Sequence, residues 1–84
     1  MTKKVKTPLD QLPPGAYAEV CELGGGKTFA NRLASMGLSV GSRLKVLQNS
    51  GHGPLLILVR NTRIALGRGE AMKILAEEKA YGEA

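Results

Sequence analysis

Two short stretches of the chain alternate between apolar and polar residues, as a strand with one buried face does. In the first, residues 16–23, Ala18 and Val20 share the face that we expect to be buried. In the second, residues 43–50, the leucine and the valine of the segment RLKV do the same. The pattern therefore predicts a half-buried strand in each stretch.

A third strand is predicted from the nearly continuous apolar run at residues 55–60. Such a run is typical of a strand that is buried on both faces, or of one that keeps a face for a partner. Alternation places Leu56 and Leu58 on one face and the three other apolar residues on the opposite face. A small barrel has one interior, so Leu56 and Leu58 are either covered by the helix or exposed to a partner.

Turn-forming residues divide the rest of the chain into short elements. A single turn is expected at residues 8–12, a tight reversal at 61–62, a strand at 63–69, one helical turn at 70–73 and a final strand at 73–77. About five short strands and one helix predict a mainly β fold, a small and strongly curved antiparallel barrel. Closure of the barrel would remove the sheet edges that otherwise promote aggregation.

The one clear helix is predicted between the first two strands. Phe29, Leu33 and Met36 lie at i, i+4 and i+7, so they form one apolar stripe that packs on the barrel. Arg32 lies at the edge of that stripe, and Thr28 is the expected N-cap. The helix is therefore expected to be a short plug over the core.

The end of this helix is predicted from its glycines. Gly37 suits the left-handed conformation that often follows a helix, because it has no Cβ to clash there. Leu38 is then expected to fold back on Leu33, and Gly41 to allow the turn into the next strand.

Length and composition are those of one small globular domain. A chain of 84 residues, 43% of them hydrophobic, builds one core and has little surface to spare. We expect a single domain over residues 1–84. Residues 1–7 are predicted to be a mobile basic tail and residues 78–84 a frayed C-terminus.

The formal net charge of +5 keeps a nucleic-acid partner open as an alternative to a merely solubilising surface. Small barrels bind single strands by stacking bases on exposed aromatic rings beside basic grooves. The aromatic residues here are Tyr17, Phe29 and Tyr81, and Phe29 belongs to the apolar stripe of the helix. The sequence thus offers no evident stacking platform, and we expect no nucleic-acid partner.

Motifs of catalysis and metal binding are not recognisable in the sequence. The segment GGGKT at residues 24–28 resembles part of a phosphate-binding loop, but Cys21 stands where that motif needs its first glycine. Cys21, Glu22 and His52 do not fall in a zinc-binding spacing. Asp10 is the only aspartate, and no nucleophile, base and orienting group are spaced recognisably. We expect no enzymatic activity, no cofactor and no metal ligands.

The compartment is predicted from the cysteine content and the apolar runs. A single cysteine excludes an internal disulfide and fits a reducing compartment. The start of the chain lacks the apolar run of a signal peptide. The longest apolar run, LLILV, is far shorter than the roughly 20 residues of a membrane helix. We therefore expect a cytoplasmic protein.

The order of these motifs resembles that of the FeoA family, small cytoplasmic proteins of bacterial ferrous iron uptake. The resemblance runs from about Leu9 to Ala76, and its most specific part is the motif R-L-x-x-M-G-L-x-x-G. The residues that carry this signature here are Arg32, Leu33, Met36, Gly37, Leu38 and Gly41, and a second block comprises Gly53, Pro54, Ile64, Ala65, Leu66, Ala71 and Ile74.

The resemblance implies an SH3-like barrel with the helix inserted after the first strand. It also implies a non-enzymatic accessory of FeoB, a membrane permease with a cytoplasmic GTPase domain, with ferrous iron as the cargo of the system. Such a protein would reach the membrane only through its partner, and self-association into a homo-oligomer stays open. A related barrel forms the C-terminal domain of DtxR-type repressors, so a transition-metal-responsive regulatory module is the alternative.

Three residues are predicted to bind the partner, on chemical grounds. Arg32 has the reach to pair with a carboxylate, and Leu56 and Leu58 form the second apolar face of their strand. The competing interpretation of Arg32 is an ion pair within the protein surface.

Overall fold

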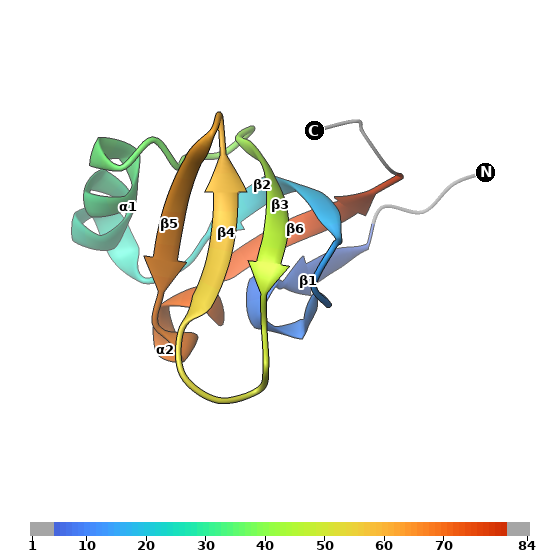
Figure 1. Ribbon diagram of the computed structural model, residues 1–84. Helices are drawn as coiled ribbons and strands as arrows, with labels where there is room; N and C mark the ends of the chain where they lie inside the picture. The colour runs from blue at the N-terminus through green and yellow to red at the C-terminus, as the bar shows by residue number, and fades with distance from the viewer. Residues whose placement is uncertain (1–4, 81–84) are drawn as a thin grey trace.

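The computed structural model describes residues 5–80 and contains one six-stranded antiparallel sheet with short helices at its margins (Figure 1). The strands follow one another in space in the order β1-β6-β2-β3-β4-β5. Their bounds are β1 Lys6–Pro8, β2 Tyr17–Leu23, β3 Arg43–Gln48, β4 Leu55–Val59, β5 Thr62–Leu66 and β6 Ile74–Lys79. The helices are the 3-10 helix η1 Leu9–Gln11, α1 Gly26–Ser35 and α2 Arg68–Ala71.

The sheet bends around the core at β2, which pairs with both β3 and β6 and carries a bulge. The first half of β2 pairs with β3, while most of its length pairs with β6. Cys21 is the extra residue of a bulge in β2, and Leu47 is that of a second bulge in β3. A bulge bends its strand and increases the local twist, so the sheet curls into the predicted barrel shape. The ladder of the described residues ends at β1 and β5, so the predicted closure by strand pairing is wrong.

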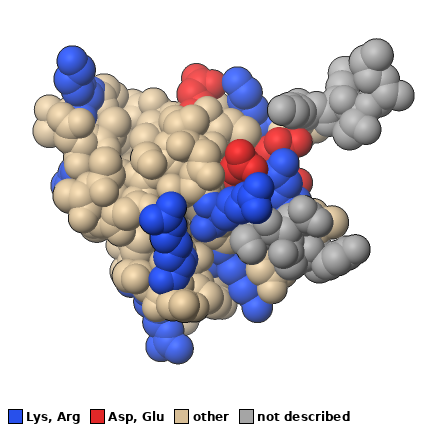
Figure 2. Space-filling model, turned by 90° about the horizontal axis from the view of Figure 1, so that it is seen from above, with Lys and Arg blue, Asp and Glu red and all other residues tan. Residues whose placement is uncertain are grey.

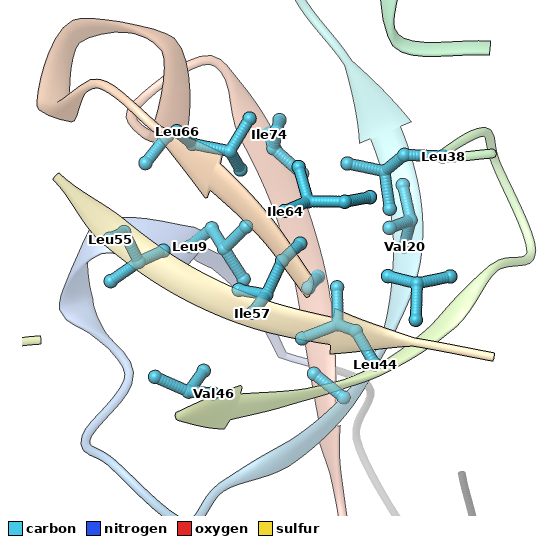
Figure 3. Close-up of a cluster of buried hydrophobic side chains, with 14 of the residues drawn as sticks. Leu9, Val20, Leu38, Leu44, Val46, Leu55, Ile57, Ile64, Leu66 and Ile74 are labelled. Atoms are coloured by element: carbon cyan, nitrogen blue, oxygen red, sulfur yellow. The ribbon is translucent and has the colours of Figure 1, made fainter. Parts of the chain in front are cut away.

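The core contains only hydrophobic side chains among the described residues (Figure 3). Side chains from β2, β3, β4, β5 and β6 point into it, and Leu38 contributes from the loop after α1. The residues that alternation turns inward in the predicted strands 16–23, 43–50 and 55–60 are confirmed as buried. The fully buried members include Leu9, Ala18, Val20, Leu33, Leu38, Leu44, Val46, Leu55, Ile57, Leu66, Ile74 and Ala76.

The strand count and the expected termini need correction. Six strands form, because Lys6–Pro8 pairs with β6 inside the stretch predicted to be a mobile tail over residues 1–7. Strand β6 likewise continues to Lys79, inside the stretch predicted to be frayed over residues 78–84. Residues 1–4 and 81–84 lie outside the described part. Helix α1 therefore follows the second strand of the chain and not the first.

The hairpin between β4 and β5 turns one residue earlier than predicted. Val59 pairs with Thr62, so Arg60 and Asn61 are the two central residues, with φ of 50° and 68°. Two consecutive positive φ angles define the type I′ turn, which matches the twist of the flanking strands. The following strand is correspondingly shorter than predicted and ends at Leu66, and the helical turn starts at Arg68.

The start of α1 differs from the prediction. Gly25 is the N-cap, with φ of 85°, and no side chain caps the helix, so the prediction of Thr28 as the cap is wrong. A Cβ on Gly25 would lie 3.0 Å from the Phe29 ring and 3.0 Å from Cδ of Lys73. The helix thus begins earlier because a glycine turns the chain where no side chain fits.

The end of α1 follows the prediction except at one residue. The Leu38 N–H donates to the Leu33 carbonyl and the Gly37 N–H to the Ala34 carbonyl, both at 2.9 Å. This pair of bonds is the Schellman motif, with Gly37 at φ of 93°. Leu33 and Leu38 are both fully buried, as expected of the contact across this motif. Met36 is the C-cap and is exposed, so its placement in the buried stripe is wrong.

Candidate docking surface

The pairing register aligns a row of side chains across the outer face of the sheet. Tyr17 of β2 lies opposite Lys45 of β3, Lys45 lies opposite Leu58 of β4, and Leu58 lies opposite Arg63 of β5. Paired residues in a sheet point to the same face. Tyr17, Lys45 and Leu58 are half-buried and Arg63 is exposed. We call these four residues the outer row.

An open groove of about 630 Å³ lies at one end of the outer row. It brings together Tyr17 at the start of β2, the start of β3, the end of β4 and the β4–β5 turn. The start of β3 and the β4–β5 turn lie at the upper end of the molecule in Figure 1, and β2 passes behind β3. Gly41 lines it too, and its φ of 94° makes the turn that was predicted for it. The lining residues are Tyr17, Gly41, Ser42, Arg43, Leu44, Lys45, Leu58, Arg60 and Asn61.

The groove and the outer row carry positive charge that no carboxylate of residues 5–80 pairs with. The ammonium of Lys45 lies 5.4 Å from the centroid of the Tyr17 ring, a cation–π contact that keeps the charge at the surface. Arg60 and Arg63 make no ion pair with any described carboxylate. Figure 2, which looks down on this end, shows several blue side chains near the middle of the face, with red ones directly beside them, and further blue ones around its margin.

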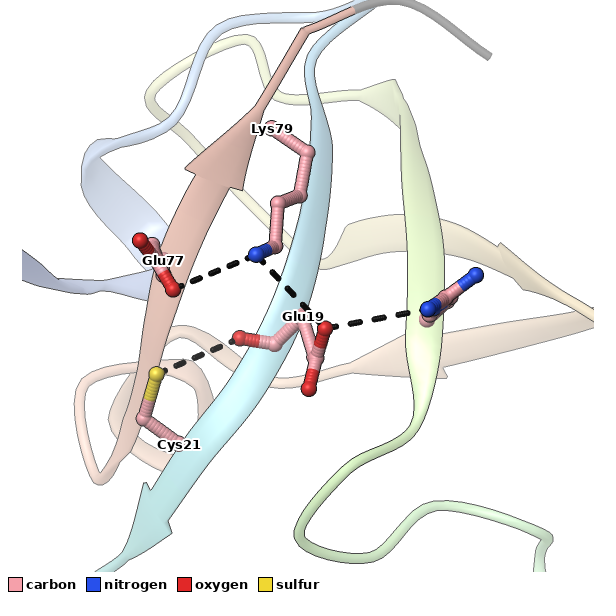
Figure 4. Close-up of polar contacts among 5 residues, drawn as sticks. Glu19, Cys21, Glu77 and Lys79 are labelled. Carbon is pink, nitrogen blue, oxygen red and sulfur yellow. Dashed lines mark hydrogen bonds and ion pairs between the residues drawn. The ribbon is translucent and has the colours of Figure 1, made fainter. Parts of the chain in front are cut away.

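The carboxylates beside the groove are occupied by other cations (Figure 4). Glu19 lies 3.8 Å from Nε of Arg43 and 3.7 Å from Nζ of Lys79. Lys79 also donates to Glu77 at 3.3 Å. Glu19 and Glu77 are therefore engaged by Arg43 and Lys79, whereas Lys45 and Arg60 are groove cations that no carboxylate of residues 5–80 pairs with.

Leu56 and Leu58 lie together on the outer face of β4, as the alternation predicted, and both are half-buried. Leu56 is opposite Gln48 of β3 and Ala65 of β5. Helix α1 lies beside β5 and α2 near its lower end, and neither crosses the front of β4 (Figure 1). This face is therefore not covered by the helix.

Arg32 lies elsewhere and is held within the protein. Its guanidinium pairs with the Glu70 carboxylate of α2 and lies 5.7 Å from the Phe29 ring, while the Arg32 side chain stays 57% exposed. The Gly67 N–H donates to Oε1 of Glu70 at 3.0 Å. That bond, helped by Arg32 and Lys73 and opposed by desolvation, holds the pKa of the Glu70 carboxyl below its ordinary value. Arg32 as a partner-binding residue stays a prediction.

The three sequence-level candidates for metal binding do not come together. In the described residues no group of three His, Cys, Asp or Glu side chains is arranged to hold a metal ion. Cys21 Sγ lies 3.6 Å from the Glu19 carbonyl oxygen, and Glu22 pairs with Lys6 at 3.1 Å. His52 is exposed in the loop after β3. Within residues 5–80, no helix has the length and apolar character of a membrane span.

The groove was missed by the sequence analysis, although its residues were visible there. Alternation puts Tyr17 on the face opposite Ala18 and Val20, and Arg43 and Lys45 on the outward face of the next strand, but nothing local showed which of these residues become neighbours, and no face was predicted for Arg63. That information lies in the register between strands, which is a long-range property.

The fold and this surface define a small SH3-like β-barrel module with an apolar and basic outer face. The profile of the FeoA domain matches residues 7–78, and the chain belongs to the FeoA domain family. It is 41% identical over 75 residues to a Methanocaldococcus jannaschii protein provisionally named Fe(2+) transport protein A, a match that covers 89% of this chain and 90% of the relative. The resemblance drawn from the sequence motifs is thereby confirmed.

Solved structures of other FeoA proteins have the same fold. A crystal structure described as the iron uptake regulatory protein FeoA superposes with a TM-score of 0.81 at 32% identity, covering 89% of this chain and 99% of that one. The Chlorobium tepidum FeoA protein superposes with a TM-score of 0.80 at 28% identity, covering 93% of this chain and 75% of that one. A zinc complex of Stenotrophomonas maltophilia FeoA, described as an SH3 domain protein, gives 0.68 at 29% identity, covering 83% and 88%.

A manganese-dependent repressor and the IdeR protein contain the same barrel as part of longer chains. A manganese-dependent transcriptional repressor superposes with a TM-score of 0.82 at 21% identity, but the match covers 94% of this chain and 45% of the repressor. The IdeR protein of T. acidophilum superposes with a TM-score of 0.81 at 19% identity, and the match covers 37% of its length. At these identities the likeness shows a shared fold alone.

Proposed function

We propose that the chain is a non-enzymatic cytoplasmic accessory of ferrous iron uptake that binds the cytoplasmic part of a FeoB-type GTPase-permease. Membership of the FeoA family and the names of its relatives support the iron-transport context. The S. maltophilia relative is described as a candidate activating factor of bacterial ferrous iron transport. Ferrous iron is the cargo of that system, and this chain acts on the transporter and not on the metal.

The observation that carries the proposal is the uncovered outer face of β4. Leu56 and Leu58 stand there between the flanking strands, with Lys45 on one side of Leu58 and Arg63 on the other. Apolar side chains rimmed by charges are typical of a protein-binding surface. The repressor-like alternative, a metal-responsive module, has no comparable support, because the described residues bring no three metal-binding side chains together.

The test is capture of the purified GTPase domain of the permease by this protein and by two variants. Leu56→Thr with Leu58→Thr introduces threonines, which are good strand formers, but removes the apolar surface, so it should reduce capture strongly. Arg32→Glu tests the remaining predicted contact. Capture that is equal for the parent and for the double threonine variant would overturn the proposal for this face.

A further inference from the structure

We propose that the groove beside Leu58 takes a short acidic segment of the protein partner, with an apolar residue of that segment seated on Leu58. The inference rests on the proposed function in taking the occupant to be a part of the partner. It adds the chemistry of the segment and the residues that recognise it.

Charge complementarity is the first support. Lys45 and Arg60 line the groove without an ion pair to a carboxylate of residues 5–80, whereas Arg43 lies 3.8 Å from Glu19. Arg63 extends the positive charge along the outer row on the far side of Leu58. Opposite charges across an interface steer association and fix its register, so acidic side chains are the matching chemistry.

The arrangement of charged and apolar residues is the second support. Leu58 lies between Lys45 and Arg63 in the row, so an apolar contact is flanked by a cation on each side. Neighbouring strands are separated by about 4.8 Å, so the backbone positions of Lys45 and Arg63 are roughly 10 Å apart across the sheet, which about three residues of extended chain span. A segment with carboxylates on both sides of a leucine or a similar residue matches this order.

The turn that carries Arg60 is the third support. Arg60 holds φ of 50° at the first central position of a type I′ turn, where asparagine, aspartate and glycine are favoured. A long side chain in this conformation is uncommon, and such positions cluster at functional sites. The turn places Arg60 among the residues that line the groove.

A peptide fits the surface better than a nucleic acid does. A single strand would need exposed aromatic rings for stacking. The Tyr17 ring is half-buried and lies beside the Lys45 ammonium, and Phe29 is a buried residue of α1. The centre of the outer row is the apolar Leu58, which gives no hydrogen bonds to bases.

The experiment measures binding of a fluorescent peptide with a central leucine between glutamates, by anisotropy, to the full-length protein. The reference peptide has glutamine at every glutamate position. We expect the acidic peptide to bind more tightly than the reference peptide and to weaken as salt increases, because surface charge pairs are screened. Equal binding of the two peptides would overturn the proposal.

Variants locate the site. Lys45→Glu and Arg60→Glu should each weaken the acidic peptide about tenfold, because each converts an attraction into a repulsion. Lys27→Glu is the matched control, because it makes the same charge change at an exposed residue on α1, outside the groove, and should change binding less than about twofold. An equal loss in all three variants would show a general charge effect and would overturn the groove as the site.

Two further measurements separate the possible failures. Single-stranded RNA that displaces the peptide and loses its own binding in the groove variants would overturn the peptide proposal in favour of nucleic acid. Capture of the permease domain that is unaffected by Lys45→Glu and Arg60→Glu would overturn the groove but leave the proposed function standing. Groove-dependent peptide binding without any capture of the permease domain would support the groove and overturn that proposed partner.

Discussion

We expect Asn49, just after β3, to contribute strongly to the stability of the fold. Its side-chain amide Nδ2 donates to the carbonyl oxygens of Asp10 at 2.9 Å and Leu12 at 2.7 Å. One side chain thereby ties the end of β3 to η1, which lies 37 and more residues earlier in the chain. Leu9 and Leu12, on either side of this contact in η1 and its cap, belong to the core.

The cost of Asn49→Ala follows from these two hydrogen bonds. Each contributes about 1 kcal/mol net, so their loss costs about 2 kcal/mol. Two smaller effects oppose each other. The Leu12 carbonyl loses a partner, whereas removal of the Asn49 Oδ1, a buried atom without a hydrogen-bond partner in the described structure, relieves a small penalty. In a domain of this size 2 kcal/mol corresponds to a fall in Tm of about 8–16 °C.

The measurement is urea unfolding followed by circular dichroism, with a thermal melt as the second readout. Asn49→Asp should be less stable than Asn49→Ala at neutral pH, because a carboxylate would face two carbonyl oxygens without a proton to donate. It should recover part of the loss as acid protonates it. Ser50→Ala is the control, because the Ser50 hydroxyl donates to the His52 carbonyl at an exposed position, so its loss should cost less than about 0.5 kcal/mol. An Asn49→Ala variant that melts with the parent would refute the reasoning.

Four further expectations concern the backbone and pH. Gly37→Ala should cost about 1 kcal/mol in urea unfolding through left-handed strain alone, since a Cβ there meets nothing. Gly25→Ala should cost clearly more than Gly37→Ala, because its Cβ would also press on the Phe29 ring; equal costs would contradict that packing. Arg60→Asn should raise stability by about 0.5–1 kcal/mol while weakening the acidic peptide, and a loss of stability would contradict the assigned turn. The folded pKa of Glu70 lies below the unfolded value of about 4.5, so its stabilising contribution is complete above that value and is lost as the pH falls through the folded pKa. Glu70→Gln should therefore flatten the acid end of a stability-against-pH curve, and an unchanged curve would contradict the shift.

The parts of the fold that local patterns dictate were predictable. The end of α1 was, because a glycine after an amphipathic turn and a leucine beyond it are sufficient for the Schellman motif. The inward faces of β2, β3 and β4 were also predictable, because the alternation of apolar and polar residues decides the face within each single strand. Gly25 as the N-cap was not predicted, since the need for a glycine there comes from the close approach of the Phe29 ring and of Lys73, and Lys73 is distant in sequence.

The site was less predictable because it depends on register and on bulges. Cys21 and Leu47 each add one residue to a strand, and nothing in their chemistry marks a bulge. The short strand β1 forms only because β6 offers it an edge, so a basic and polar N-terminus looked like a tail. Leu56 and Leu58 were found from alternation, but the cations that flank Leu58 became its neighbours only through strand pairing.

The carboxylate of Glu70 accepts two hydrogen bonds at once: one oxygen accepts from the Gly67 N–H and the other from Arg32. Any acidic group of a partner that recruits this arginine must therefore displace an existing counter-ion instead of meeting a vacant cation. Binding at Arg32 would therefore replace one ion pair with another, and the free energy gained would be the difference between two similar ion pairs. The Glu70 carboxylate, without its arginine, would then be a new negative site between α1 and α2.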